Sequence, residues 1–596
     1  MKKFLFLAAL AAASVFAACH EKEEQTNSPS DGKEITLRAT ISEGAKALLD
    51  ETSLQMLWQE GDQIDVMNMG SHNCGAYTLE SGNGTTNATF VGSDFTESKE
   101  YYALYPYRTG MSKSSGYYRF AIPQDQTYAE NSVGRGANIM VATFTSQSEL
   151  LQFKNVLGLL KLSLSGTAKV YKITVTDNNG TNNLWGSAAL YVNDGTQGSD
   201  GQVLTITGGD NSVNLLCPDG VQLSSVAKPF YIAVPPGSFA TGMTVRIYEA
   251  DDYLLDEFST VRDIAIVRSN IRPMKSKNVL RDLSKDGTSN CYVVYTNGEY
   301  KFKTVKGNGN ESVGSPVTAD VLWESSGTTT APTVGDIVSS PSYADGYVSF
   351  SVTGTAGNAV IAVRDSENNI LWSWHIWVPS TTIETATYTG KTAEVMDRNL
   401  GALVAAENNI LSNGLTYQWG RKDPFPGSAS YSSNTVAATT GSFTSSVTTA
   451  EKGTEAYVIL HPTDYLKQDK AIQTNSDWVV GGDGNNTHWG SSKTIWDPCP
   501  VGYKVPSHTI WSDLSFEVGT YSMTLDSKHW YPVTGYRFSS DGSIHETGAK
   551  GFYWTSVAGQ YQANYGKFEY TPSGTSTFGS SSMARSAGLA VRCVKE

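Results

Sequence analysis

The sequence has few of the residues and motifs that build catalytic and nucleic-acid-binding sites. Only 17% of its 596 residues are charged, and the formal net charge is −14. With no basic cluster in this acidic chain, we expect no binding to nucleic acid. No GxSxG, P-loop or HExxH motif occurs, and the eight histidines are dispersed singly. These absences argue against an enzyme. The alternative left open is a polysaccharide hydrolase, which needs only two of the 58 acidic residues to meet in space.

Cysteine is also scarce, with six residues in the whole chain. Cys74, Cys217 and Cys291 have no short spacing, so the sequence predicts neither a metal site nor a CxxC redox site, and we expect no cofactor. Cys499 and Cys593 lie near the two ends of one predicted domain. In an oxidising compartment, a disulfide between them would stabilise that domain by about 4 to 5 kcal/mol in the chain-entropy model.

The N-terminus combines positive charge with a short apolar run. Lys2 and Lys3 precede residues 4–18, which are small or apolar and too few to span a bilayer. Residues 15–19, Val-Phe-Ala-Ala-Cys, resemble the lipobox of bacterial lipoproteins. This resemblance implies that residues 1–18 are a signal peptide and that Cys19 is acylated. Each buried lipid methylene contributes about 0.8 kcal/mol, so two or three acyl chains would anchor the protein. The alternative is ordinary signal cleavage that leaves a free thiol.

An acidic segment follows Cys19. Residues 20–24 read His-Glu-Lys-Glu-Glu, and residues 25–32 are polar, so residues 19–32 are predicted to form a flexible tether. The segment is similar to the acidic export signal of surface lipoproteins in gut Bacteroidetes. That similarity implies an outer-membrane lipoprotein exposed at the cell surface. The alternative is a solvated tether without a signalling role.

The remaining composition favours β-structure. The chain holds 56 glycines and 31 tyrosines, with abundant Ser and Thr. Residues 34–41 alternate strictly, so Ile35, Leu37, Ala39 and Ile41 share one face of a half-buried strand. We therefore expect a mostly β protein.

The first half of the chain contains five segments in a characteristic order: residues 58–64, 88–92, 101–107, 122–127 and 151–157. As an ordered set they resemble the fimbrillin family of Bacteroidetes. The resemblance implies two transthyretin-like β-sandwich domains, at 33–165 and 166–281, and fimbrial subunits as partners.

Arg38 is a candidate processing site by the same resemblance. In assembled fimbrillins, a protease cut after an arginine near the first strand opens a groove that accepts a strand from the next subunit. The alternative for Arg38 is an ordinary outward-facing residue on a half-buried strand.

A third unit is expected after a polar linker at 282–289. Asn297-Gly298 lies between two β-rich runs and predicts a hairpin, and residues 290–383 are interpreted as a small β-sandwich. His375 lies among three tryptophans, and we interpret it as a packed strand residue.

The last region, 384–596, differs from the rest in its frequent tryptophans and longer loop-like segments. Residues 396–402, 417–427, 496–506, 551–556 and 590–594 together resemble the major paralogous domain known from Fibrobacter succinogenes. The resemblance implies a C-type lectin-like α+β domain. Ser507 is predicted to cap a short helix there, and residues 538–544 are predicted to form a hairpin.

The expected function is adhesion. Tryptophans interspersed with polar loop residues are candidates for stacking on a ligand, namely Trp419, Trp478, Trp489, Trp511 and Trp530. The calcium-lectin sequences EPN, QPD and WND are missing, so no metal site is predicted. Residues 483–486 are interpreted as a turn, and the alternative is that their oxygens bind calcium. We expect a fimbrial accessory or tip-type subunit that presents its C-terminal domain to a glycan or a surface protein. A free-standing glycan-binding lipoprotein is the main alternative.

Overall fold

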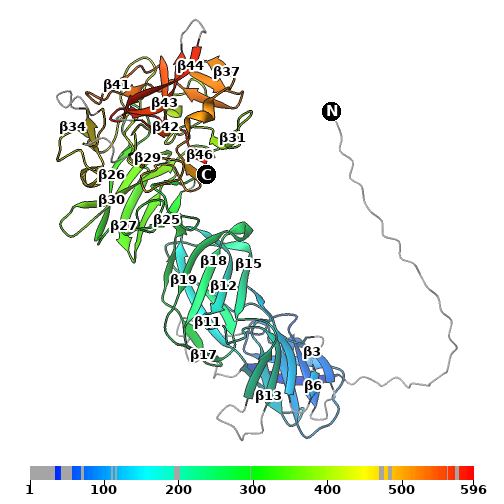
Figure 1. The fold of residues 1–596 in the computed structure, drawn as a ribbon. Helices are drawn as coiled ribbons and strands as arrows, with labels where there is room; N and C mark the ends of the chain where they lie inside the picture. The colour runs from blue at the N-terminus through cyan, green and yellow to red at the C-terminus, as the bar shows by residue number, and fades with distance from the viewer. Residues whose placement is uncertain are drawn as a thin grey trace, which may run out of the picture. The chain divides into compact units, whose positions relative to one another are not determined.

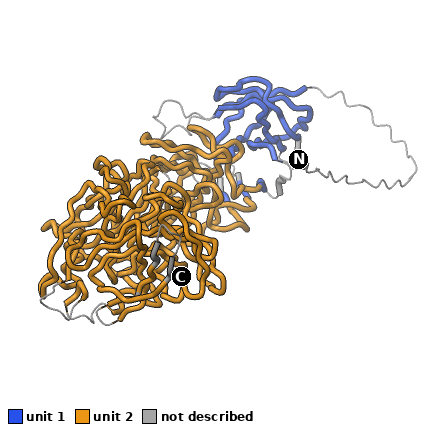
Figure 2. Tube along the Cα trace, turned by 90° about the horizontal axis from the view of Figure 1, so that it is seen from above, with its two compact units in different colours: residues 1–120, 139–156, 189–204 blue, residues 121–138, 157–188, 205–596 orange. Residues whose placement is uncertain are grey.

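The computed structural model describes residues 34–41, 57–68, 73–108, 112–114, 117–192, 202–295, 297–468, 476–480, 486–559, 562–570 and 576–596. Cys19 and the predicted signal peptide and tether lie outside the described residues. The chain forms two compact units (Figure 2). Unit 1 comprises 1–120, 139–156 and 189–204, and unit 2 comprises 121–138, 157–188 and 205–596. The described residues are mostly β-structure (Figure 1), as the sequence predicts.

Unit 1 contains a closed barrel, with strand order β1-β10-β9-β5-β2-β3-β4. The first strand, β1, pairs antiparallel with β4 and parallel with β10. Its alternation is as predicted, because Leu37, Ala39 and Ile41 are buried while Arg38 is exposed. The strands are β1 (Ile35–Ile41), β2 (Gln63–Asn68), β3 (Asn73–Ser81), β4 (Asn87–Gly92), β5 (Tyr101–Tyr105), β9 (Met140–Phe144) and β10 (Leu150–Asn155).

Trp58 fills the barrel core. Its ring makes edge contacts with Phe90, Tyr105 and Phe153, at centroid distances of 5.0, 5.4 and 5.4 Å. Its indole N–H donates to the carbonyl oxygen of Thr86, at 3.0 Å. Edge contacts and a satisfied N–H make a buried tryptophan a strong core residue. The segments of the fimbrillin resemblance that include these aromatics therefore supply the core of the barrel.

Unit 2 begins with a β-sandwich. A sheet of order β19-β18-β12-β15-β8 contributes to a core shared with a second sheet, β16-β11-β21, in which β22 also pairs with β11. Leu160, Leu162 and Leu164 of β11 lie in this core, so it begins before the boundary expected at residue 166. The strands are β8 (Asp125–Thr127), β11 (Gly158–Gly166), β12 (Lys169–Asp177), β15 (Ser212–Gln222), β16 (Lys228–Val234), β18 (Met243–Tyr248), β19 (Leu254–Ser259), β21 (Ile271–Pro273) and β22 (Lys277–Val279).

Two four-stranded sheets follow, with orders β23-β25-β28-β27 and β24-β30-β29-β26. They enclose a further apolar core. The start of the predicted linker at 282–289 belongs to this fold, because β23 pairs with β25. The strands are β23 (Arg281–Asp282), β24 (Cys291–Val293), β25 (Gly298–Lys303), β26 (Thr318–Ser325), β27 (Val338–Ala344), β28 (Tyr347–Val352), β29 (Gly357–Arg364) and β30 (Ile370–Val378).

The C-terminal region is made of long loops and short strands. Among the described residues it holds the one α-helix, α1 (Glu455–Leu460), which Thr454 caps through its side chain. Its largest sheets have orders β31-β32-β46-β36, β33-β45-β40-β41, β37-β38-β39 and β42-β43-β44. The strands are β31 (Thr385–Thr387), β32 (Glu394–Met396), β33 (Tyr417–Gln418), β36 (Tyr503–Lys504), β37 (Phe516–Gly519), β38 (Ser522–Leu525), β39 (His529–Pro532), β40 (Tyr536–Arg537), β41 (Ile544–His545), β42 (Lys550–Ala558), β43 (Gln562–Tyr570), β44 (Ser576–Ala584), β45 (Gly588–Leu589) and β46 (Val594–Lys595).

Two local predictions in this region have different outcomes. The predicted hairpin is present, since β40 pairs with β41. The helix predicted after Ser507 is a 3-10 turn, His508–Trp511, and the Ser507 side chain makes no capping hydrogen bond, so that prediction is wrong in detail. Ser512 is extended and Asp513 has a φ of 59°, which ends the turn before Leu514. Among the described residues, no helix is long and apolar enough to cross a membrane.

Candidate functional site

Strand β30 connects the C-terminal region to the sheets before it. Nearly all side chains of β30 are buried. Since successive side chains of a strand point to opposite sides, both faces of β30 are therefore buried. Trp372, Trp374 and Ile376 enter the core between the two sheets. Trp377 enters a second core with Trp419, Trp478 and other residues of the C-terminal region. Strand β30 thus contributes to two cores, one within residues 290–383 and one shared with residues 384–596.

His375 lies on the face of β30 that points toward the C-terminal region. Its Nε2 is 2.9 Å from the Asn358 side-chain oxygen, so Nε2 carries the proton and donates it. Burial lowers the pKa of His375 to about 3, which keeps the ring neutral at physiological pH. The side chain is 2% exposed, in agreement with its interpretation as a packed strand histidine.

The five candidate tryptophans have two kinds of environment. Trp419, Trp478, Trp489 and Trp511 are at most 1% exposed, so the expectation that they face a ligand is wrong. Their indole N–H groups are satisfied internally; for example, Trp419 donates to Thr555 O at 2.8 Å and Trp478 donates to Trp419 O at 2.7 Å. These large rings instead fill the cores of the C-terminal region.

Trp530 alone of the five is partly exposed. It lies on β39, and its carbonyl oxygen accepts a hydrogen bond from Arg592 at 2.7 Å. A Cβ built on Gly519 would lie 2.5 Å from the Glu407 carboxylate and 2.8 Å from the Trp530 ring. Because Gly519 has no Cβ, both side chains can lie close to its backbone. The carboxylate also accepts the backbone N–H of Thr520. Of the five predicted tryptophans, Trp530 is therefore the one that remains available to a ligand, with a carboxylate beside it.

Buried arginines hold the loops of the C-terminal region together. Arg398 forms two hydrogen bonds of 2.8 Å with the carboxylate of Asp397 and also donates to the Thr381, Thr382 and Leu403 carbonyl oxygens. Arg421 and Arg537 likewise donate to backbone carbonyls. The planar guanidinium offers five donors, which suits it to satisfying loop carbonyls that no sheet pairs. The charged motif residues of this region thus have structural partners.

Lys422 and Asp423 form a buried ion pair beneath β30. The Lys422 ammonium is 2.7 Å from Asp423 Oδ1 and 2.6 Å from Ser373 Oγ, and it lies 4.4 Å from the centre of the Trp372 ring. Its side chain is 0% exposed, and burial lowers the pKa of Lys422. A lysine next to a serine and a carboxylate is a set of residue types that also occurs in catalytic sites. Its ammonium is fully buried and is bonded to Ser373 and Asp423 within the fold.

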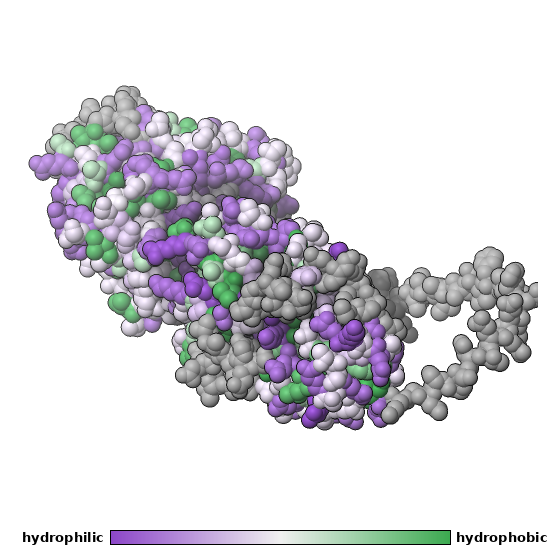
Figure 3. Space-filling model, turned by 90° about the horizontal axis from the view of Figure 1, so that it is seen from below, coloured by the Kyte–Doolittle hydropathy of each residue, from purple (hydrophilic) through white to green (hydrophobic). Residues whose placement is uncertain are grey.

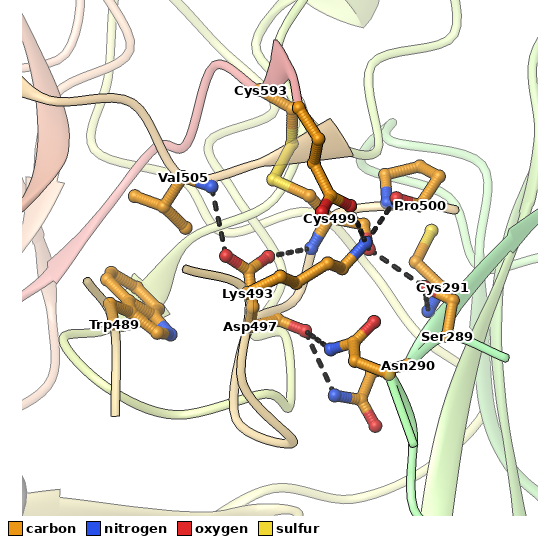
Figure 4. The surroundings of a disulfide bond; sticks show 12 residues. Ser289, Asn290, Cys291, Trp489, Lys493, Asp497, Cys499, Pro500, Val505 and Cys593 are labelled. Atoms are coloured by element: carbon orange, nitrogen blue, oxygen red, sulfur yellow. Dashed lines mark hydrogen bonds and ion pairs between the residues drawn. A yellow bond between two sulfur atoms is a disulfide. The ribbon is translucent and has the colours of Figure 1, made fainter. Parts of the chain in front are cut away.

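The cysteines differ in their surroundings. Cys499 and Cys593 form a disulfide with an S–S distance of 2.07 Å (Figure 4). Asp497 accepts the backbone N–H groups of Cys499 and Val505 beside it, at 2.8 and 3.0 Å. Cys217 and Cys291 are buried free thiols. Burial raises the pKa of Cys217 to about 12, so this thiol is not reactive at neutral pH.

The remaining predicted features are Arg38 and the segment 483–486. Arg38 is exposed on β1, and its guanidinium donates to Ser148 O at 3.2 Å. Among the described residues, no group of three or more His, Cys, Asp or Glu side chains is arranged to hold a metal ion. Residues 483–485 of the segment interpreted as a turn lie outside the described residues. On the face drawn in Figure 3, apolar residues are dispersed among polar ones.

Comparison with known proteins gives only distant structural likenesses. No protein-family model and no curated protein matches the chain. A fimbrial protein from Bacteroides ovatus is 12% identical and has a TM-score of 0.19, with 94% of this chain and 98% of that chain covered. A candidate cell adhesion protein from Bacteroides uniformis is 17% identical, with a TM-score of 0.26, covering 42% of this chain and 95% of that one. Another, from Bacteroides thetaiotaomicron, is 11% identical, with a TM-score of 0.22 and coverages of 41% and 92%.

Proposed function

We propose that this chain is a non-enzymatic adhesion protein, anchored in the outer membrane through acylated Cys19 and exposed at the cell surface. The observation that carries the proposal is that the charged motif residues of the C-terminal region, which would be the natural catalytic candidates, are structural. Arg398, Arg421 and Lys422 are 0–2% exposed and bonded within the fold. We infer that a mostly β scaffold of this kind acts as a spacer and a presenting surface.

Within this function, the proposed role is a fimbrial accessory or tip-type subunit of the fimbrillin type, with a C-type lectin-like module at its C-terminus. Strand β46 supports an end position, because it pairs with both β32 and β36 and follows the disulfide cysteine Cys593. A strand bonded on both edges is not free to pair with another subunit. Strand β1 supports an accepting role, since a cut after Arg38 would separate residues 35–38 from the rest of the strand, and these residues pair with 89–92 of β4.

The proposal is tested by binding and by assembly, with the whole mature chain, because residues 290–383 share a core with the C-terminal region. A glycan array with and without chelator tests for a sugar ligand. Trp530→Ala should weaken binding at least about tenfold, whereas Trp185→Ala, which removes a partly exposed tryptophan outside the C-terminal region, should leave it unchanged. Equal effects of the two variants would exclude Trp530 as the contact.

Fibre co-purification and N-terminal sequencing separate the two forms of the proposal. A chain that begins at Ala39 in purified fibres supports processing at Arg38 and a fimbrial role. A chain that begins at Cys19 in fibres would exclude processing. Glycan binding by a monomer that never co-purifies with fibres would favour the free-standing glycan-binding lipoprotein.

A further inference from the structure

The His488 side chain has both ring nitrogens directed at hydrogen-bond acceptors. Its Nδ1 is 2.9 Å from the carbonyl oxygen of Gly420, and its Nε2 is 2.8 Å from Oε1 of Glu455, the first residue of α1. The His488 side chain is 4% exposed, whereas that of Glu455 is 50% exposed. One imidazole thus connects three separate stretches of the C-terminal region.

The chemistry of these partners requires a second proton on the ring. A carbonyl oxygen only accepts, so the bond to Gly420 needs a proton on Nδ1. An ionised carboxylate also only accepts, so the bond to Glu455 needs a proton on Nε2. The neutral ring carries one proton and satisfies one partner. If Nδ1 keeps it, the Nε2 lone pair faces a carboxylate oxygen, and that contact is repulsive.

The two side chains differ in their freedom to respond. The ring of His488 is stacked on Trp496, with centroids 4.5 Å apart and planes at 15°, and it also lies 5.9 Å from the Trp478 ring. A Cβ at Gly420, where φ is +80°, would come within 3.1 Å of the His488 Cβ, so this stretch also holds the ring closely. Glu455 is half exposed and can turn to water when the ring loses its proton.

The charged groups that act on the ring are Glu455 and Arg585. Glu455 favours the protonated ring, while the positive charge of Arg585 and the burial of the ring disfavour it. Burial is the largest effect and lowers the pKa of His488 below 6.5. The ring therefore gains its second proton only below pH 6.5.

We propose that His488 and Glu455 form a proton-dependent clamp, which ties α1 to the Gly420 loop when the ring is protonated and releases the helix N-terminus when the ring is neutral. The clamp is a property of the C-terminal region and does not rest on the adhesive role. Its opening is local, because Val458 of α1 stays in the core with Trp419 and Trp478. The device makes the mobility of this surface region depend on pH.

The first test measures the titration of His488 in the whole chain, by hydrogen–deuterium exchange at the imidazole Cε1 position with mass spectrometry. The midpoint should lie below 6.5. Glu455→Gln removes the favourable charge and should lower the midpoint by roughly half a pH unit or more. The control Glu451→Gln changes an exposed carboxylate in the segment before α1 and should leave the midpoint unchanged. An unchanged midpoint in Glu455→Gln would overturn the proposal.

The second test measures backbone exchange at the first residues of α1 as a function of pH, corrected for the intrinsic rate. Protection should fall several-fold as pH rises through the His488 midpoint, and it should be independent of pH in His488→Gln and Glu455→Gln. Protection that is constant with pH in the natural chain would contradict the clamp. If His488→Gln does not fold, Glu455→Gln still decides, because its side chain is half exposed.

Discussion

Lys301 and Asp256 form an ion pair that joins the first sandwich of unit 2 to the sheets that follow it. Asp256 lies on β19 and its side chain is 0% exposed, while Lys301 lies on β25 and its side chain is 10% exposed. The Lys277 ammonium is 3.8 Å from the second carboxylate oxygen of Asp256. Nearby, Arg281 donates to both carboxylate oxygens of Glu249, at 2.6 and 2.9 Å. Charge pairs thus fix the junction next to the polar linker that was expected at 282–289.

Removal of Lys301 should destabilise this junction strongly. In Lys301→Met, the buried Asp256 keeps the backbone N–H groups of Glu257 and Leu280, but its one remaining ion-pair partner among the described residues is the more distant Lys277. Breaking a buried pair typically costs about 3 to 5 kcal/mol. Lys172→Met is the matched control in the same sandwich, because its partner Asp252 is 75% exposed, and such pairs contribute less than about 1 kcal/mol. Urea unfolding followed by circular dichroism measures both variants. Equal losses in the two would show that the Lys301 pair is worth no more than a surface pair.

The disulfide should be the largest single covalent contribution to the C-terminal region. Cys499 and Cys593 are 94 residues apart in sequence, so the chain-entropy model predicts a loss of about 4 to 5 kcal/mol in the Cys499→Ala/Cys593→Ala double variant. Thermal unfolding with and without reductant measures it. Reductant should destabilise the natural chain to about the level of the double variant and should not affect the double variant itself. A natural chain indifferent to reductant would contradict the prediction.

Sequence patterns predicted the strands well, but they predicted poorly which individual side chains are buried and which are exposed. The alternation at Leu37, Ala39 and Ile41 specifies a strand face by itself, because side chains in strands alternate with period two. The tryptophans and charged residues of the C-terminal region have no such period. Whether Trp419 or Trp530 reaches solvent depends on residues distant in sequence, such as Thr555 of β42 for Trp419 and Glu407 for Trp530, and no local pattern encodes those contacts.

The burial of β30 on both faces can be predicted in part from the sequence. Nine consecutive residues from Ile370 to Val378 are nearly all apolar or aromatic, which is typical of a strand buried on both sides. This pattern suggests an additional layer beyond a two-sheet sandwich. The identity of that layer could not be predicted, because Trp377 donates to Ala402 O across a loop that sequence alone does not place.

Asp497 should make the stability of the C-terminal region fall as pH rises. Burial is the main cause that raises the pKa of Asp497 from 3.8 to about 6, so the folded protein holds this proton more tightly than the unfolded chain does. Its stabilising effect is complete below pH 3.8 and is lost as pH rises through about 6, with a total on the order of 3 kcal/mol. Asp497→Asn removes the titration. The slope of unfolding free energy against pH between 5 and 7 should differ between the natural chain and this variant, and identical slopes would contradict the prediction.

Two glycines with the same backbone conformation separate strain from steric clash. Gly548 and Gly502 have φ values of +76° and +75°, but a Cβ at Gly548 would lie 2.0 Å from the backbone oxygen of Tyr431, whereas a Cβ at Gly502 meets nothing within 4 Å. Gly502→Ala should therefore cost about 1 to 2 kcal/mol, the price of a left-handed residue with a Cβ. Gly548→Ala adds a clash with rigid backbone, so its cost should reach about 2 to 5 kcal/mol when about 1 to 3 kcal/mol for overpacking is included. Chemical denaturation of both variants measures the difference, and a Gly548→Ala protein as stable as Gly502→Ala would show that the Tyr431 loop moves freely away from residue 548.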